Sequence, residues 1–390
     1  MSAFLSQGPI GLVLLILLMG FVVVIHELGH YLAGRFFGAA VESFSVGFGK
    51  PIFERRDKRG TRWRINWIPL GGFVKFVGES QLPGDVERDD SGPVGKPYPS
   101  LGVGARSIVS AAGPAANFIL AILLFAIMFF ANGTYETRVY AAALSEEGAA
   151  AQAGMLPGDI FVSVDGVEVK SPDDILMKTV YSTGNVLPFV VERDGALITL
   201  EVTPERKIRK NTVGQMQAQG TIGAEIAELS DHRKHITYGP VEALGAGVNR
   251  TGETLALTTS MLGRIITGAE PISNLSGPVA IGDTSRRIFN MTMGNEELPF
   301  SSRSWLLFWN MVMICASISV GIGFFNLLPL PVLDGGHLVF NAYEAVTGKL
   351  LPAKVQEAAL TAGLVLLLGL FVVITWGDVL ETGLFNSPRG

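Results

Sequence analysis

Four long stretches without a single charged residue constrain this 390-residue chain more than any other feature. They cover residues 9–25, 107–133, 305–333 and 358–377. A helix that spans a bilayer needs about 20 apolar residues, so each stretch is long enough, the first by including the helical turn that follows it. Hydrophobic residues make up 48% of the chain and charged residues only 17%. The sequence therefore predicts a polytopic α-helical membrane protein with four transmembrane helices.

The distribution of positive charge predicts the orientation of these helices. Twelve Lys and Arg residues lie from Arg35 to Arg106, and none precedes them. By the positive-inside rule, residues 35–106 lie in the cytoplasm and residues 134–304 lie outside, which in a bacterium is the periplasm. A cleaved signal peptide is the alternative for the first stretch, but it lacks a basic start and a small-residue cleavage site. We therefore expect a retained helix in a bacterial inner (plasma) membrane.

The regions between the apolar stretches differ in pattern. Residues 35–106 alternate apolar and polar side chains with Gly and Pro breaks, which predicts β-hairpins close to the membrane. Residues 240–266 carry apolar side chains at helical spacing, which predicts an amphipathic helix. The expected divisions are 1–34 (first helix), 35–106 (cytoplasmic loop with hairpins), 107–133 (second helix), 134–206 (small α+β domain), 207–304 (linker and amphipathic helices), 305–333 (third helix), 334–357 (cytoplasmic-side loop), 358–377 (fourth helix) and 378–390 (tail).

The first apolar stretch runs directly into the sequence HELGH. Residues four apart share one face of a helix, so His26 and His30 can direct two ring nitrogens at one metal ion, with Glu27 beside them. HExxH on a helix is a metalloprotease pattern, with two zinc ligands and a general base. Two histidines in a polar network are the alternative, but polar side chains at membrane depth are more often functional.

A catalytic zinc site needs a third protein ligand, and Asp334 is the best candidate. It is the only acid between residues 305 and 343, and the Pro and Gly residues around it, in NLLPLPVLDGGH, interrupt a helix. Irregular backbone at membrane depth is tolerated where it lines a cavity. A helix N-cap is the alternative role for Asp334. His337 is a rival ligand or a second-shell group, whereas His232 and His235 lie in a polar stretch. The only cysteine, Cys315, excludes a cysteine-based zinc site.

HELGH in the first apolar helix and NLLPLPVLDGG in a later one resemble the site-2 protease family, peptidase family M50. GFGKP, NWIPLGGFVKF, AAGPAANF and NLSGPVAI also match, and the order of parts is closest to the regulator-of-sigma-E protease branch. The resemblance implies an intramembrane zinc metalloendopeptidase in which His26, His30 and Asp334 bind Zn²⁺ and Glu27 is the catalytic acid and base. It also assigns Asn117 and Asn326 to substrate binding; a hydrogen bond between helices is the alternative for each.

The stretch EEGAAAQAGMLPGDIFVSVDGVEV resembles the PDZ pattern, with turns at Gly158-Asp159 and Asp165-Gly166. The expected fold therefore includes one α+β PDZ-like periplasmic domain. The regulator-of-sigma-E protease itself carries two PDZ domains. PDZ domains bind extended peptides by strand addition, so peptide C-termini are expected partners. The resemblance further implies single-pass membrane substrates that a site-1 protease has already trimmed. Anti-sigma factors and remnant signal peptides are not distinguished as substrates.

Two other functions remain open from the residues alone. A catalytically inactive membrane scaffold that displays a PDZ domain would tolerate Glu27→Gln. A metal transporter would use the same His and Asp side chains as transport ligands and would tolerate that change too. The net charge of −5 gives no reason to expect nucleic-acid binding.

Overall fold

The computed structural model describes residues 2–79, 92–180, 182–210, 216–270, 272, 275 and 277–381. The chain divides into two compact units. The membrane unit comprises residues 1–125, 247–255 and 276–390, and the sheet unit comprises residues 126–246 and 256–275. Each unit is described by itself.

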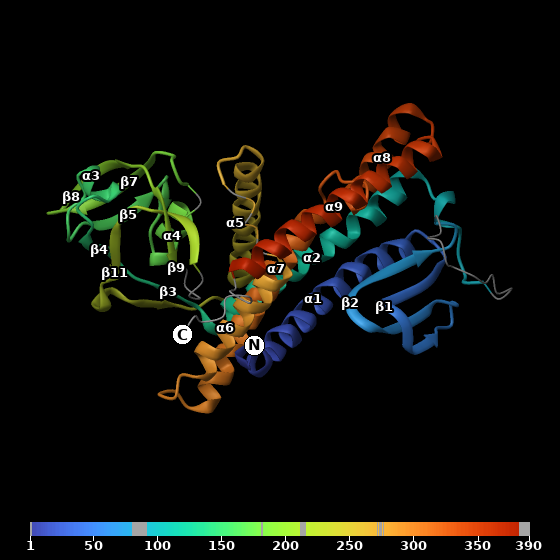
Figure 1. Ribbon diagram of the computed structural model, residues 1–390, viewed down its shortest axis with the longest axis horizontal. Coiled ribbons are helices and arrows are strands. Elements are labelled where there is room, and N and C mark those ends of the chain that lie inside the picture. The colour runs from blue at the N-terminus through green and yellow to red at the C-terminus, as the bar shows by residue number, and fades with distance from the viewer. Residues whose placement is uncertain are drawn as a thin grey trace. The chain divides into compact units, whose positions relative to one another are not determined.

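In the described part of the chain, four helices are long and apolar enough to cross a membrane. They are α1 (Ser2–Phe36), α2 (Val103–Asn132), α7 (Phe300–Asn326) and α9 (Ala353–Glu381) (Figure 1). Large apolar side chains such as Leu17, Ile119 and Val365 are exposed on them, which suits contact with lipid rather than water. These helices correspond to the four charge-free stretches of the sequence.

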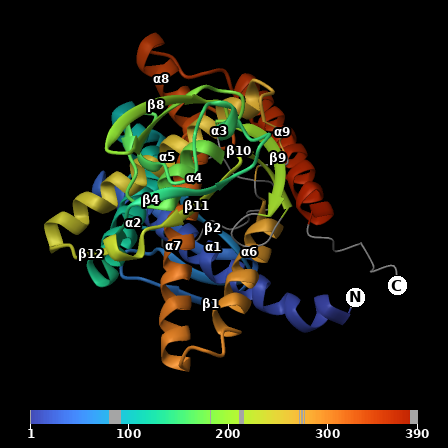
Figure 2. The same ribbon diagram turned by 90° about the vertical axis from the view of Figure 1, so that its left-hand side faces the viewer.

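Two shorter helices complete the membrane unit, α6 (Pro278–Met293) and α8 (Asp334–Thr347). α6 packs against α1 and α7 (Figures 1 and 2), and a Cβ atom on Gly11 would lie only 2.8 Å from the carbonyl oxygen of Gly282. The first amides of α6 are bonded by the buried Asp378 of α9, which accepts from the backbone N–H groups of Gly277 at 3.2 Å and Ala280 at 3.0 Å. α8 occupies much of the segment 334–357, which we expected to be a loop.

Strands β1 (Val41–Arg56) and β2 (Arg62–Phe76) form a β-sheet in the region where the sequence predicts hairpins. Both strands bend, so that residues 41–46 pair with residues 72–76 on one side and with residues 62–65 on the other. Gly47 and Gly71 have φ values of +80° and +82°, which favour glycine at the bends. The segment 73–76 is therefore an outer edge of this sheet.

The sheet unit is built on one six-stranded antiparallel sheet (Figure 1). Its sheet has the order β11-β4-β5-β7-β8, with β6 paired to β5, so β11 and β8 are its edge strands. The sheet extends to residue 228, beyond the end at 206 that we expected. The bounds are β4 (Val139–Leu144), α3 (Ala149–Gln152), β5 (Ile160–Val164), β6 (Val167–Glu168), α4 (Pro172–Val180), β7 (Leu187–Arg193), β8 (Ala196–Val202) and β11 (Ala224–Glu228).

Two hairpins complete this unit, and one long helix contributes its residues 240–246 and 256–266 to it. β9 (Glu205–Lys210) pairs with β10 (Met216–Thr221), and β3 (Thr134–Glu136) pairs with β12 (Lys234–Ile236), so the two ends of the folded module meet. α5 spans Pro240–Ile266, the range in which the apolar spacing predicts an amphipathic helix.

A buried ion pair stabilises the sheet unit at one of the turns that the sequence marked. Gly158 has a φ value of +94°, and Asp159, only 1% exposed, follows it. The Arg193 guanidinium donates to both oxygens of Asp159, at 2.7 and 2.6 Å, and the N–H of Leu156 donates to Oδ2 at 2.8 Å. These hydrogen bonds to the charged form hold the pKa of the Asp159 carboxyl below its ordinary value.

Candidate metal centre

Within the described residues, one group of three His, Cys, Asp or Glu side chains is placed to hold a metal ion. It consists of His26, His30 and Asp334. The Nε2 atoms of the two histidines are 3.2 Å apart, and Oδ2 of Asp334 lies 3.1 Å from Nε2 of His26 and 3.3 Å from Nε2 of His30. The structure thus brings the two sequence-distant motifs together.

These distances fit a zinc ion. Zinc binds nitrogen and oxygen donors at about 2.0–2.2 Å, so two donors on a tetrahedral ion lie roughly 3.3–3.5 Å apart. The three measured separations are close to that edge length. Oδ2 of Asp334 is buried without a hydrogen-bond partner, as expected of an atom that faces a cation. Three protein donors leave the fourth tetrahedral position open, which is the pattern of catalytic zinc sites.

The backbone around Asp334 folds tightly to present the carboxylate. α7 ends at Asn326, and after a short irregular segment Asp334 is the first residue of α8. Cβ atoms on Gly335 and Gly336 would lie 2.2 and 2.3 Å from backbone oxygens of Leu328 and Leu330, so only glycine fits at these two positions. Leu333 occupies the N-cap position instead of Asp334, and it makes no side-chain capping hydrogen bond.

Residues of α2 contact the Nδ1 atoms of both histidines. Nδ1 of His30 lies 2.8 Å from the carbonyl oxygen of Val109, and Nδ1 of His26 lies 3.1 Å from Nδ2 of Asn117. Because a carbonyl only accepts, His30 carries its proton on Nδ1, which leaves the Nε2 lone pair free for a metal. The same helix therefore fixes the rings whose other nitrogens point towards Asp334.

Glu27 lies between the histidine face of α1 and the small sheet. A Cβ atom on Gly72 of β2 would lie 3.4 Å from Cγ of Glu27 and 3.5 Å from Cγ1 of Val23. Glu27 is half-buried and does not belong to the three-donor group. A carboxylate beside the donors, without being one of them, is available as an acid or base.

Gly113 of α2 is a site residue to which the sequence analysis assigned no role. A Cβ atom there would lie 2.3 Å from Nε2 of His30 and 2.8 Å from Nε2 of His26. Any side chain at this position would occupy the space of the metal. The stretch AAGPAANF contains Gly113, but only the way α1 and α2 cross reveals the contact.

The other candidate side chains do not belong to the three-donor group. Nδ2 of Asn326 donates to the carbonyl oxygen of Ile322 in its own helix at 3.0 Å. His337 is exposed, with its ring 6.3 Å from that of Phe340. His235, in the sheet unit, lies 2.8 Å from the carbonyl oxygen of Asn132 through Nε2. Substrate binding by Asn326 stays a prediction.

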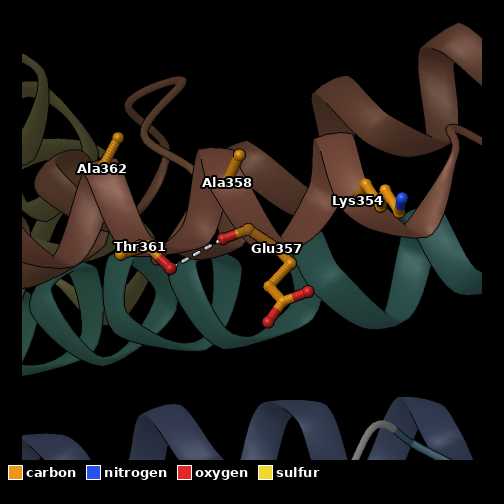
Figure 3. Close-up of a pocket in the computed structure, with 5 residues that line it drawn as sticks. All are labelled: Lys354, Glu357, Ala358, Thr361 and Ala362. Atoms are coloured by element: carbon orange, nitrogen blue, oxygen red, sulfur yellow. Dashed lines mark hydrogen bonds between the residues drawn. The ribbon is translucent and has the colours of Figure 1, made fainter.

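A shallow pocket on α9 is unrelated to this centre (Figure 3). All five of its lining residues come from that one helix, and Oγ1 of Thr361 donates to the carbonyl oxygen of Glu357 at 2.8 Å. The lining residues are Lys354, Glu357, Ala358, Thr361 and Ala362. A hollow on one helix, without histidine, has no part in the metal chemistry.

Apolar spanning helices, two histidines one turn apart, a distant aspartate and an adjacent glutamate define a multi-pass membrane metallohydrolase. The chain belongs to peptidase family M50, whose sequence model matches residues 14–370. It is 35% identical to "Metalloprotease MmpA" of Caulobacter vibrioides, over 97% of this chain and 98% of that protein. It is 37% identical to "Putative zinc metalloprotease Atu1380" of Agrobacterium fabrum, over 93% of this chain and 94% of that protein. Zinc is the cofactor, and the donors present fit it.

Proposed function

We propose that the protein is an intramembrane endopeptidase that cleaves transmembrane segments of other membrane proteins. One observation carries the proposal: two of the three metal donors belong to an apolar spanning helix, and the third closely follows another. His26 and His30 belong to the span Val13–Phe36, and Asp334 follows the span Phe300–Asn326. Charged and metal-binding side chains are expensive within a bilayer and are kept there for function. A zinc peptidase whose site lies at that depth acts on peptide bonds at that depth.

The arrangement assigns a role to each side chain. Zinc, when bound, supplies Lewis acidity that lowers the pKa of a water molecule towards neutrality. His26, His30 and Asp334 would hold it. Glu27 takes a proton from the attacking water and returns it to the leaving amine. α2 and the sheet of β1 and β2 flank the histidines and Glu27 and limit access of bulk water.

The outer edge of the β1–β2 sheet, residues 73–76, is the proposed docking edge for the substrate. A peptide bond inside a transmembrane helix is hydrogen-bonded and shielded, so the substrate must unwind before cleavage. Leaving its amides unsatisfied in the membrane would cost several kcal/mol each. Pairing with an edge strand satisfies them, and Gly72, next to this edge, packs against Glu27. A hairpin that merely shields the metal from lipid is the structural alternative.

The sheet unit is proposed to be a PDZ-like domain in the periplasm that takes extended peptide C-termini. Its Asp165-Gly166 turn, with φ values of +50° and +74°, joins β5 to β6, and β11 is a free edge for strand addition. The unit would exclude substrates with large external domains, so cleavage follows trimming by a site-1 protease. On this proposal the protein acts in regulated intramembrane proteolysis at the bacterial inner membrane, on anti-sigma factors or remnant signal peptides.

Detergent-purified protein incubated with a synthetic transmembrane peptide tests the proposal. We expect cleavage by the wild type, loss of cleavage with a zinc chelator, and recovery on adding zinc back. Cleavage that resists both the chelator and Glu27→Gln would overturn the proposal. Metal flux through vesicles in both the wild type and Glu27→Gln, without cleavage, would favour the transporter.

A further inference from the structure

The contact between His26 and Asn117 leaves one polar atom without a partner, and it would bring two hydrogen-bond donors together when a metal is bound. Asn117 has no exposed surface, and its Oδ1 atom is buried without a hydrogen-bond partner. Its Nδ2 atom faces Nδ1 of His26 at 3.1 Å. A histidine that gives the Nε2 lone pair to a metal carries its proton on Nδ1, so Nδ1 needs an acceptor. An amide nitrogen cannot accept, so in the metal-bound state two donors would face each other.

Turning the Asn117 amide by 180° resolves both problems at once. The two ends of an amide have nearly the same shape, and the hydrogen-bond network decides between them. After the turn, Oδ1 accepts from the Nδ1–H of His26 and is no longer unsatisfied. We propose that Asn117 is a positioning residue, whose side-chain oxygen fixes the tautomer and ring orientation of the zinc ligand His26. This inference rests on the zinc chemistry of the proposed function.

The other histidine ligand already shows the same arrangement. Nδ1 of His30 lies 2.8 Å from the carbonyl oxygen of Val109, which can only accept. Val109 and Asn117 both belong to α2, so one helix supplies acceptors to both rings. Groups that hold the second nitrogen of a metal-bound histidine set ligand basicity as well as orientation.

The backbone of Asn117 is itself held by α7. Oγ of the buried Ser319 donates to the carbonyl oxygen of Asn117 at 2.8 Å. Gly323, one turn further along α7, lets the helices approach so closely that a Cβ atom there would lie 3.3 Å from Cβ of Asn117. The α2–α7 contact therefore fixes Asn117 where it meets His26. A side chain buried to this degree acts on a substrate through the ligand that it holds.

Two substitutions of Asn117 distinguish its role as a hydrogen-bond acceptor from other roles of the side chain. Asn117→Leu removes the acceptor at similar size, whereas Asn117→Asp keeps an acceptor and removes the donor. Zinc affinity is measured on the full-length detergent-solubilised protein by competition with a chromophoric chelator. We expect Asn117→Leu to bind zinc roughly 10- to 100-fold more weakly than the wild type. Asn117→Asp is expected to bind zinc at least as tightly as the wild type. A higher zinc affinity in Asn117→Asp than in Asn117→Leu would show that the acceptor oxygen is what matters at this position.

The matched control is Asn310→Leu. Asn310 is a membrane-helix asparagine on α7 whose amide lies 3.5 Å from Oγ1 of Thr292, away from the three donors. We expect its zinc affinity to equal that of the wild type. Thermal stability of the metal-free forms is compared in parallel, because a purely structural role for Asn117 would lower that stability and leave zinc affinity unchanged.

Three results would overturn the assignment. They are wild-type zinc affinity in Asn117→Leu, equal losses in Asn117→Leu and Asn117→Asp, and a ¹⁵N spectrum of the histidine-labelled, zinc-loaded wild type in which Nδ1 of His26 lacks a proton. The chain has only five histidines, which makes that spectrum assignable. Failure of the proposed function is distinct: there the wild type itself would bind no zinc or cleave no peptide.

Discussion

Among single side chains, Glu27 lies beside the metal donors without being one of them, so a mutation of Glu27 can separate metal binding from catalysis. Glu27→Gln keeps a side chain of the same size next to Gly72 but removes the proton acceptor. We expect zinc content to stay at the wild-type level while the rate of peptide cleavage falls by about 10²- to 10⁴-fold, the usual contribution of general acid–base catalysis. Metal analysis and a peptide-cleavage assay on the same preparation check this. Loss of zinc from this variant would mean that Glu27 is a ligand.

Gly113 provides a second test at this scale. A methyl group at residue 113 would collide with the two Nε2 atoms that face the metal, so we expect Gly113→Ala to lose zinc binding and activity. The control is Gly104→Ala on the same helix, where a Cβ atom would meet nothing within 4 Å. Metal analysis after dialysis compares the two. Full zinc occupancy in Gly113→Ala would contradict the geometry of the site.

How much of the site was predictable varies by residue. His26 and His30 were predicted from helical spacing, because residues four apart share a face, and the structure places their Nε2 atoms 3.2 Å apart. Glu27 was predicted from the HExxH pattern. Asp334 followed from being the only acid in its apolar surroundings. Gly113 could not be predicted, because its role depends on where α2 crosses α1. That crossing is a tertiary contact, and local sequence does not encode it.

Among the elements, the pairing of β5 and β7 depends on the Asp159–Arg193 ion pair. Because Arg193 lowers the pKa of Asp159, the stabilisation is fully present above the ordinary carboxyl pKa of about 3.9 and is lost as the pH falls through the lower, folded-state pKa. We expect Arg193→Met to lower the unfolding free energy of the sheet unit at neutral pH.

Hydrogen exchange of β5 and β7 in the full-length protein, corrected for intrinsic rates, measures this difference. The gap between wild type and Arg193→Met is expected to shrink as the pH is lowered below 4, since the wild type loses the same stabilisation. A gap that stays constant with pH would show that packing of the Arg193 side chain, and not the ion pair, is responsible.

The start of α6 depends on a side chain from the last helix. Asp378 accepts hydrogen bonds from the N–H groups of Gly277 and Ala280, which have no partner within α6. We expect Asp378→Leu to destabilise this first turn by about 0.5–2 kcal/mol and to raise hydrogen exchange there. Asp378→Asn, which keeps one acceptor oxygen, should show a smaller effect. Unchanged exchange in Asp378→Leu would mean that the cap contributes nothing measurable.

Among helices and strands, the sequence predicted best those whose apolar residues form long runs or recur at regular spacing. The four spanning helices and α5 are long and strongly patterned, and each overlaps its expected range, although α7 ends at Asn326 and not at residue 333. α8 was missed because the Gly-Gly pair after Asp334 indicates a break, whereas here it permits close backbone contact. β11 was missed because its pairing with β4 is distant along the chain.

For the molecule as a whole, the pairing of β3 with β12 shows how most of the sheet unit can be removed. Thr134 pairs with Ile236, so replacing residues 137–233 by a short Gly-Ser loop leaves a closed hairpin. We expect this variant to cleave a short transmembrane peptide at the wild-type rate and to cleave a substrate with a large external domain faster than the wild type does. Both rates are measured in detergent and in vesicles. Unchanged sparing of the large substrate would refute exclusion by the module.

The residues of the metal centre are translated at very different times. His26 and His30 leave the ribosome early, whereas Asp334 is translated only when most of the chain has been made and inserted. No nascent fragment that ends before α8 has the third donor. An unfinished copy therefore lacks one of the three donors, and a truncated product released by premature termination would not assemble the metal centre.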